Sequence, residues 1–289
     1  MTPLDPRRNA YRPDLADERL RGHVKAERFV TGTPMRVAVP SIELHAKPTG
    51  GEPPTTEGLL GEDVLVFDAQ KDWAFVQLVR DGYTGYLARE ALTPASEEKP
   101  THRIAALWAL GFKAADIKSP LRLVLPMGAQ VTGEAAGDFL KLNSGVYIPI
   151  QHVAPAGSRE PEFVAIAERF VGTPYRWGGK TALGIDCSGL VQISLQSAGA
   201  EVPRDSDMQA AELGWSIGPA EWRNPMRGDL VFWRGHVGIM VDGERLLHAN
   251  AHHMAVVTEP LAAVVERAQA RGSPITDVRR TYAPAANQD

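Results

Sequence analysis

The sequence has a single cysteine among its 289 residues, so it cannot form an internal disulfide bond. It also has no uninterrupted apolar stretch of about 18 residues, the length that a membrane-spanning helix requires. The first residues, MTPLDPRRNAYRPDLADERLRG, lack the apolar core of a secretory signal peptide. From these absences we expect a chain without disulfides or membrane spans that works in the cytoplasm.

An excess of positive charge is missing as well, because 31 Lys and Arg residues face 35 Asp and Glu residues and the net charge is −4. Nucleic acids and anionic membranes usually bind basic surfaces, so neither is expected as a partner. The sequence contains no HExxH motif and no cysteine cluster, and the isolated pair His252-His253 does not suffice for a metal site. The run YRWGGK lacks the spacing of a phosphate-binding loop. We therefore expect no metal and no cofactor.

The first half of the chain consists mainly of short β segments. Residues 1–33 are charged and contain proline, and we interpret them as an N-terminal arm with a helical stretch near residues 14–28. In residues 34–96, aromatic and β-branched residues alternate between Gly and Asp, which predicts a small β-barrel. Its strand candidates are MRVAVPSIEL, EDVLVFDA, WAFVQLV and DGYTGYLA.

Residues 97–156 repeat this pattern weakly. The run GEDV at residues 61–64 has a counterpart in GAQV at 128–131, and Gly82-Tyr83 parallels Gly145-Val146. We interpret the segment as a second copy of the same β module. The alternative is that short-stranded β segments resemble one another in general.

Residues 157–289 change to a helical pattern followed by strands. Apolar residues recur at helical spacing after Pro161, and a second helix is expected from about Cys187 to Ala198, with Gly199 at its end. The segments GDLVFWRG, HVGIMVDG and RLLHANA follow as predicted strands. Helices followed by an antiparallel sheet predict an α+β domain.

Cys187 is predicted to open the second helix. A lone cysteine is more often an inert small hydrophobic residue than a nucleophile, so its surroundings must decide. Unpaired backbone N–H groups at a helix start stabilise negative charge, which lowers the pKa of a thiol there. The same groups can hold the oxyanion that forms when a carbonyl is attacked. This position makes Cys187 a candidate nucleophile.

A cysteine nucleophile needs a base and a group that orients the base. His236 and His248 lie in two successive predicted strands, with Asp242-Gly243 as the turn signal between them. A two-residue turn would leave the two histidines on opposite faces, whereas a three-residue loop at 242–244 would put them on one face. The catalytic hypothesis therefore requires an odd-length loop or a bulge. Asn250 is the competing candidate for the orienting residue.

Several blocks of this half together resemble the NlpC/P60 cysteine peptidases. They are PYRWGG at 174–179, DCSGL at 186–190, GDLVF at 228–232, HVGI at 236–239 and His248-Ala249. The resemblance covers residues from about 157 to 283. It implies a papain-like catalytic domain in which Cys187 attacks a peptide carbonyl, His236 is the base and His248 orients His236.

The front half resembles two bacterial SH3-like modules. With an NlpC/P60 domain behind them, they resemble the cytoplasmic enzymes of murein peptide recycling, which cleave L-Ala-γ-D-Glu-diamino acid peptides after the γ-D-Glu and require a free N-terminal L-Ala. The resemblance implies that Tyr175, Asp186, Ser188 and Ser206 recognise the amino end of the peptide. A carboxylate such as Asp186 can pair with an α-ammonium group. The alternative role for Asp186 is a helix N-cap, and the two roles are compatible.

Three more residues are candidates for the substrate pocket. The resemblance implies an acidic residue and a tyrosine from the first SH3-like module, for which we take Glu57 and Tyr83. The alternatives are a solvated loop charge for Glu57 and ordinary barrel core for Tyr83. Trp177 is a candidate for the pocket wall, with simple packing as its alternative.

The sequence thus predicts a hydrolase of murein peptides that works through a Cys-His-His triad and a thioester. Two rival functions stay open: an amidase or acyltransferase of the same superfamily, and a non-catalytic cell-wall-binding protein. The diamino acid (meso-diaminopimelate or L-lysine) and the oligomeric state do not follow from the sequence.

Overall fold

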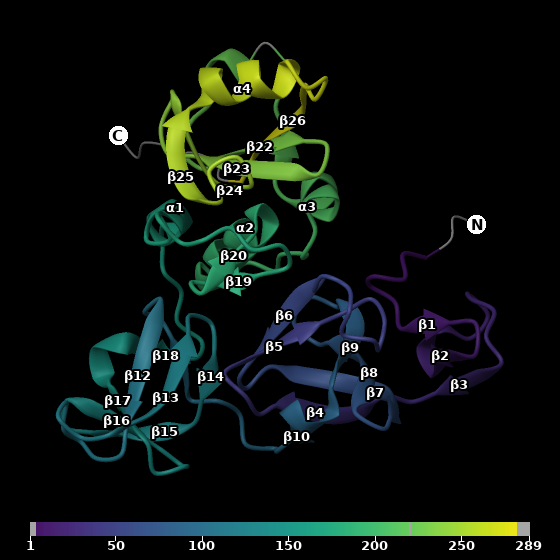
Figure 1. Ribbon diagram of the computed structural model, residues 1–289, viewed down its shortest axis with the longest axis vertical. Coiled ribbons are helices and arrows are strands. Elements are labelled where there is room, and N and C mark those ends of the chain that lie inside the picture. The colour runs from purple at the N-terminus through teal and green to yellow at the C-terminus, as the bar shows by residue number, and fades with distance from the viewer. Residues whose placement is uncertain (1–3, 220, 282–289) are drawn as a thin grey trace, which may run out of the picture. The chain divides into compact units, whose positions relative to one another are not determined.

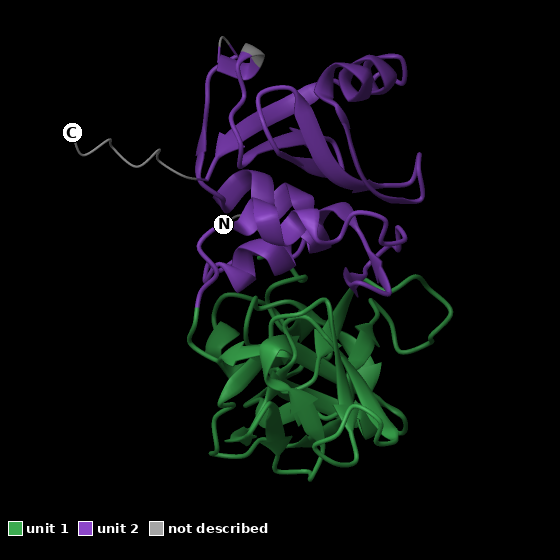
Figure 2. Cartoon of the chain, turned by 90° about the vertical axis from the view of Figure 1, so that its left-hand side faces the viewer, with its two compact units in different colours: residues 1–158 green, residues 159–289 purple. Residues whose placement is uncertain are grey.

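A computed structural model describes residues 4–219 and 221–281 of the chain (Figure 1). The chain divides into two compact units, residues 1–158 and 159–289 (Figure 2). The first unit consists of strands and short 3-10 turns, and the second combines α-helices with a sheet. The predicted α+β class is confirmed.

The N-terminal arm forms a small three-stranded sheet in the order β1-β2-β3. Its strands are β1 (Tyr11–Arg12), β2 (Leu15–Asp17) and β3 (Arg28–Val30). The helix expected near residues 14–28 is therefore wrong, since only the 3-10 turn η1 (Glu18–Leu20) is helical there. Leu15 and Ala16 are fully buried in β2, and this packing outweighs their helical propensity.

The first barrel joins a five-stranded sheet, in the order β10-β4-β7-β8-β9, with the hairpin β5-β6. The strands are β4 (Thr33–Val37), β5 (Ser41–Leu44), β6 (Thr56–Leu59), β7 (Asp63–Gln70), β8 (Trp73–Leu78), β9 (Thr84–Ala88) and β10 (Leu92–Pro94), with η2 (Arg89–Ala91) before the last. The N-terminal arm is attached to this barrel, because Thr84 Oγ1 donates to Pro6 O at 2.6 Å and Gln77 Nε2 donates to Arg8 O at 2.8 Å.

The second barrel has a five-stranded sheet in the order β13-β12-β17-β16-β15 and a three-stranded sheet in the order β14-β11-β18. The elements are β11 (His102–Ile104), β12 (Trp108–Phe112), β13 (Leu121–Pro126), β14 (Gln130–Val131), β15 (Gly133–Ala136), β16 (Phe139–Leu142), β17 (Tyr147–Pro149), η3 (Ile150–His152) and β18 (Val153–Pro155). The repeat seen in the sequence has a backbone counterpart. Gly61 and Gly128 have φ values of 82° and 88°, and Gly82 and Gly145 have 75° and 81°. Because positive φ favours glycine, the paired glycines mark equivalent turns of the two modules.

The second unit contains a six-stranded sheet in the order β21-β26-β22-β23-β24-β25. Its elements are α1 (Phe163–Glu168), β19 (Lys180–Thr181), β20 (Gly184–Ile185), α2 (Cys187–Ser197), α3 (Ser206–Glu212), β21 (Trp215–Ser216), η4 (Glu221–Arg223), β22 (Asp229–Trp233), β23 (His236–Met240), β24 (Arg245–Asn250), β25 (Ala255–Pro260), α4 (Leu261–Gln269) and β26 (Ile275–Arg280). Among the described residues, no helix has the length and apolarity needed to cross a membrane.

The sheet separates the helices of this unit. α4 covers one face, where Val264 packs with Val231, Met240 and Leu246, and α2 packs against β23 and β24 (Figures 1 and 2). Figure 1 shows α1 and α2 on the side of the sheet away from α4. α2 begins at Cys187 and is followed by Gly199 at a φ of 90°, as predicted. The nucleophile candidate and α4 thus approach the sheet from opposite faces.

The hairpin of β23 and β24 has the register that the catalytic hypothesis requires. Ile239 pairs with Leu247 and Met240 with Leu246, and Val241 N donates to Arg245 O at 2.9 Å. The loop is therefore the three residues 242–244, which confirms the predicted odd-length loop. Side chains alternate along a strand, so His236 and His248 lie on the same face.

Candidate active site

Cys187 is the first residue of α2, and Asp186 is its N-cap. The Asp186 side chain accepts a hydrogen bond from Gly189 N at 2.7 Å, which satisfies one of the free N–H groups of the first turn. The sulfur of Cys187 lies near β23, because a hydrogen bond from the Val237 backbone N–H acts on it. Val237 directly follows His236, so the nucleophile candidate is next to the strand that carries the predicted base.

The pKa of Cys187 is raised, not lowered. This pKa is about 12: burial and then the nearby Asp186 carboxylate raise it, and the backbone N–H groups of Val237 and Ser188 and the charge of Arg204 offset only part of this. The expectation of a low thiol pKa at the helix start is therefore wrong for the substrate-free protein. The thiol is neutral until a base removes its proton.

Glycines on both sides of Cys187 let the loop 178–186 lie directly on the first turn of α2. A Cβ on Gly189 would lie 2.4 Å from Gly179 O, and a Cβ on Gly179 would lie 2.2 Å from Gly184 O. No side chain fits at either position without moving the backbone. These contacts give the PYRWGG and DCSGL blocks a physical reason for their glycines.

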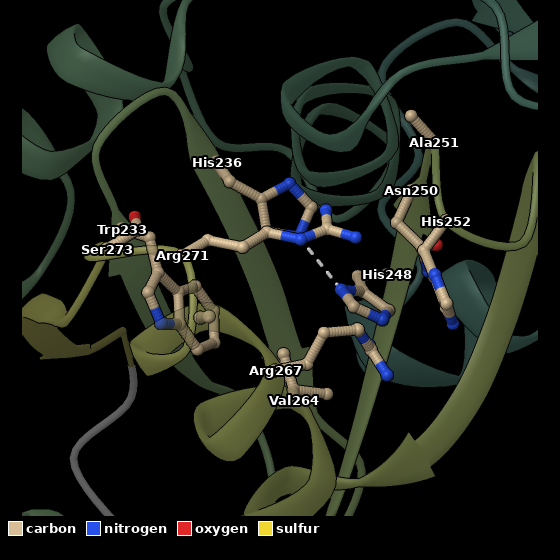
Figure 3. A pocket seen from close by; sticks show the side chains of 11 residues that line it. Trp233, His236, His248, Asn250, Ala251, His252, Val264, Arg267, Arg271 and Ser273 are labelled. Atoms are coloured by element: carbon tan, nitrogen blue, oxygen red, sulfur yellow. Dashed lines mark hydrogen bonds between the residues drawn. The ribbon is translucent and has the colours of Figure 1, made fainter.

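A chain of hydrogen bonds runs from His236 into the sheet. His236 Nε2 lies 2.8 Å from His248 Nδ1, and His248 Nε2 lies 2.9 Å from Glu259 Oε1 (Figure 3). Arg267 of α4 donates to both oxygens of Glu259. Asn250 Oδ1 accepts from His253 N instead, so His248 is the residue that hydrogen-bonds to His236.

Glu259 determines which nitrogen of His248 and of His236 carries the proton. Burial raises the pKa of Glu259, but the hydrogen bonds from Arg267 and His248 outweigh it and lower the pKa to about 2. A carboxylate can only accept, so His248 carries its proton on Nε2 and accepts at Nδ1. His236 must then carry its proton on Nε2, which leaves Nδ1 with a free lone pair. A neutral imidazole in this tautomer can remove the proton of a thiol.

The electrostatics of His236 agree with this assignment. Its pKa is lowered to about 3, mainly by burial; protonation of His248 and the charge of Arg267 also disfavour a second positive charge, and Glu259 favours it. Burial also lowers the pKa of His248, while Glu259 raises it. Both rings are neutral at pH 7, so the resting pair is a thiol and an imidazole and not a preformed ion pair.

Arg204 is a functional-site residue that the sequence analysis missed. It is 1% exposed, and its Nη1 and Nη2 donate to Asp186 Oδ1 and Oδ2 at 3.0 and 2.7 Å. Gly178 N also donates to Asp186 Oδ2, at 2.9 Å. The N-cap interpretation of Asp186 is confirmed. A substrate α-ammonium would meet a carboxylate whose charge Arg204 already neutralises.

Of the other predicted residues of this unit, Tyr175 lies near Cys187 and Ser188 near Asp186. Burial is the main cause that raises the pKa of Tyr175. A negative charge on Cys187 or Asp186 raises it as well, so Tyr175 lies close to both. Ser188 Oγ accepts from Arg204 Nη1 at 2.8 Å, so Ser188 belongs to the Asp186 cluster. Ser206 is half-buried at the first position of α3, and Trp177 is 62% exposed in the loop before Cys187. Packing in the core is therefore wrong as an explanation of Trp177.

Glu57 and Tyr83 belong to the other unit. Glu57 lies in β6 and is 2% exposed, so its alternative as a solvated loop charge is wrong. Tyr83 is 4% exposed, as expected of barrel core. Their contribution to a substrate pocket stays a prediction.

Glu259 and Arg267 are two more residues that the sequence analysis missed. Glu259 lies opposite Leu246 in the β24–β25 pairing, two positions from the residue that faces His248. The register of β25 could have revealed it, since diagonal neighbours of a hairpin share a face. No motif surrounds Glu259 in the sequence. In the described part of the chain, no cluster of three or more His, Cys, Asp or Glu side chains is arranged to hold a metal ion.

Comparison with protein families gives two matches. Residues 172–270 match the profile of the NlpC/P60 family, and residues 44–92 match that of the bacterial dipeptidyl-peptidase Sh3 domain. The first match contains Cys187, His236, His248 and Glu259. The second contains Glu57 and Tyr83.

Two curated relatives of this chain are named as dipeptidyl-peptidases. A gamma-D-glutamyl-L-lysine dipeptidyl-peptidase of Bacillus cereus is 25% identical over 71% of this chain and 70% of its own length. A dipeptidyl-peptidase 6 of Lysinibacillus sphaericus is 27% identical over 72% of this chain and 84% of its own. Among solved structures, an NlpC/P60 family protein from Bacillus cereus superposes with a TM-score of 0.73 at 19% identity, over 86% of this chain and 99% of that one. This last likeness concerns the fold.

Proposed function

Because the chain carries an NlpC/P60 peptidase domain behind a bacterial SH3 domain, we propose that it hydrolyses the γ-D-Glu-diamino acid bond of murein peptides with a free N-terminal L-Ala. The hydrogen-bonded chain from His236 through His248 to Glu259, beside a cysteine at a helix start, carries this proposal. The names of the two dipeptidyl-peptidase relatives support the choice of bond.

The proposed reaction begins at the neutral thiol. His236 Nδ1 accepts the proton of Cys187 Sγ as the sulfur attacks the γ-carbonyl carbon of D-Glu. Backbone N–H groups at the start of α2 face the oxyanion of the tetrahedral intermediate. When the C–N bond breaks, His236 returns the proton to the departing amine. Water, with His236 again as base, then cleaves the thioester and releases L-Ala-γ-D-Glu.

His248 and Glu259 act through His236 in this scheme. They keep its lone pair on Nδ1 and stabilise the imidazolium that forms after proton transfer. Asp186, Ser188 and Tyr175 border the thiol, and we assign to them the amino end of the peptide. Released peptides in the cytoplasm are the expected substrates.

The test is hydrolysis of L-Ala-γ-D-Glu-meso-diaminopimelate and its N-acetylated twin by the wild type and by Cys187→Ala. The proposal expects cleavage of the free-amine peptide alone, with none by the variant. Equal cleavage of both peptides would remove the amino-end requirement. Absence of cleavage of either would leave the amidase and wall-binding hypotheses as the better explanations.

A further inference from the structure

A cavity of about 280 Å³ adjoins the histidine pair on the α4 side of the sheet. His236 forms part of its wall, together with Trp233 of β22, Arg267 and Val264 of α4, and Arg271 of the turn that follows α4. Cys187 is not among the lining residues. Figure 3 shows Arg271 extending toward His236 and Arg267 toward His248.

The position of this cavity relates it to one half of the substrate. After attack, the acyl half is bonded to Cys187, whereas the departing amine receives its proton from His236 and must lie within hydrogen-bond reach of that ring. The carbon next to this amine carries the carboxyl group and the side chain of the leaving residue. A cavity walled by His236 and not by Cys187 is therefore on the leaving side of the scissile bond.

The charges in the cavity wall have one sign. Arg267 and Arg271 line it, and the described lining contains no Asp or Glu. Arg267 is paired with Glu259, which does not line the cavity. The Arg271 guanidinium has no hydrogen-bond or ion-pair partner among the described residues, so it is free to bind an anion. Carboxylates are the anions that a planar guanidinium binds best among peptide groups.

The rest of the wall fits an aliphatic chain. The Trp233 ring, Val264 and Ala268 provide apolar surface between the histidine pair and the turn that carries Arg271. A side chain of methylene groups that ends in a carboxylate matches this arrangement. One that ends in an ammonium group would bring a cation to an arginine, with no carboxylate in the described lining to bind it.

We propose that this cavity binds the leaving residue, with Arg271 pairing with the carboxylate at the end of its side chain. The inference rests on the proposed function and makes it more specific. The chain then prefers 2,6-diaminopimelate, whose side chain ends in a carboxylate and an ammonium group, to L-lysine, whose side chain ends in an ammonium group alone and offers Arg271 no anion. The α-carboxyl group is common to both and does not contribute to the difference.

The experiment compares kcat/KM for L-Ala-γ-D-Glu-meso-diaminopimelate and L-Ala-γ-D-Glu-L-Lys. The wild type is expected to cleave the first at least about 10-fold better, the size of one charge-assisted hydrogen bond. Arg271→Gln should lower kcat/KM for the diaminopimelate peptide about 10-fold and change that for the lysine peptide less than about twofold. Arg271→Glu should reverse the preference. Arg245→Gln, at the start of β24, is the control for loss of an exposed arginine.

Equal cleavage of the two peptides by the wild type, or equal effects of Arg271→Glu on both, would overturn the assignment. Binding of free meso-diaminopimelate and L-lysine to Cys187→Ala, measured by calorimetry, separates this inference from the proposed function. Selective binding of diaminopimelate that Arg271→Glu abolishes would support the cavity even without cleavage. Lack of both cleavage and binding would overturn the cavity and the function together.

Discussion

His248 Nε2 and Glu259 Oε1 lie 2.9 Å apart, and this contact extends the Cys-His-His set to a fourth residue. Arg267 in turn donates to Glu259, so a residue of α4 supports a group two hydrogen bonds away from His236, the proposed base. The nitrogen that carries the proton in each ring follows from the Glu259 carboxylate, which can only accept hydrogen bonds. Three of these residues come from adjacent strands, whose hydrogen-bonded ladder keeps them in register.

Replacement of Glu259 by Gln should reduce kcat by about 10- to 100-fold with little change in KM, because the amide no longer fixes the tautomer of His248. The carboxylate raises the pKa of His236, so its loss should lower that pKa and move the acid limb of the kcat/KM profile to lower pH. Glu266→Gln, an exposed change on α4, is the matched control. A fall in kcat without a shift of the acid limb would contradict the positioning role and indicate a structural one.

The single cysteine allows a direct titration of the proposed nucleophile, Cys187. Because burial raises the pKa of Cys187 to about 12, the alkylation rate of the native protein with iodoacetamide should rise about tenfold per pH unit from pH 7 to 10. The urea-unfolded protein should instead level off above the ordinary thiol pKa of about 8.5. A native rate that stays constant from pH 5 to 7 would indicate a preformed ion pair with His236 and would contradict the neutral resting state.

Arg204→Met should destabilise the protein by about 3 kcal/mol, because it leaves the buried Asp186 carboxylate without its charged partner. Urea denaturation followed by tryptophan fluorescence measures the change in the free energy of unfolding. The control is Arg245→Met, whose pair with Asp242 is exposed to solvent and should contribute little to stability. If both variants unfold at the same urea concentration, the buried pair does not stabilise the fold.

Gly189→Ala tests the packing of the loop before the nucleophile. The added methyl group would lie 2.4 Å from Gly179 O, so the loop must move, at a cost of about 1–3 kcal/mol in the free energy of unfolding. Activity should fall as well, since the same loop carries Asp186 next to Cys187. Gly218→Ala, where a Cβ would meet no atom within 4 Å, should leave both unchanged. Wild-type stability of Gly189→Ala would refute the close contact.

The sequence by itself determined much of this protein, because its signals are local. Helix α2 from Cys187 to the Gly199 stop and the strands of the first barrel follow from periodicity and turn residues. The odd length of the loop between His236 and His248 was a requirement of the catalytic hypothesis, because Asp242-Gly243 alone also allowed a two-residue turn. The paired glycines of the two modules are local signals too. The N-terminal arm was the exception, since burial of Leu15 and Ala16 against distant strands outweighed a helical pattern.

Only the tertiary structure decided which residues support the sequence motifs of the candidate site. Glu259 and Arg267 reach His248 from β25 and α4, and Arg204 reaches Asp186 from 18 residues away, so no spacing in the sequence identifies them. The raised pKa of Cys187 has the same origin. The N–H group of Ser188 at the helix start does lower the thiol pKa. Burial raises this pKa by more, because the cost of burying a thiolate depends on all the residues packed around it. Those residues come together only when the chain folds.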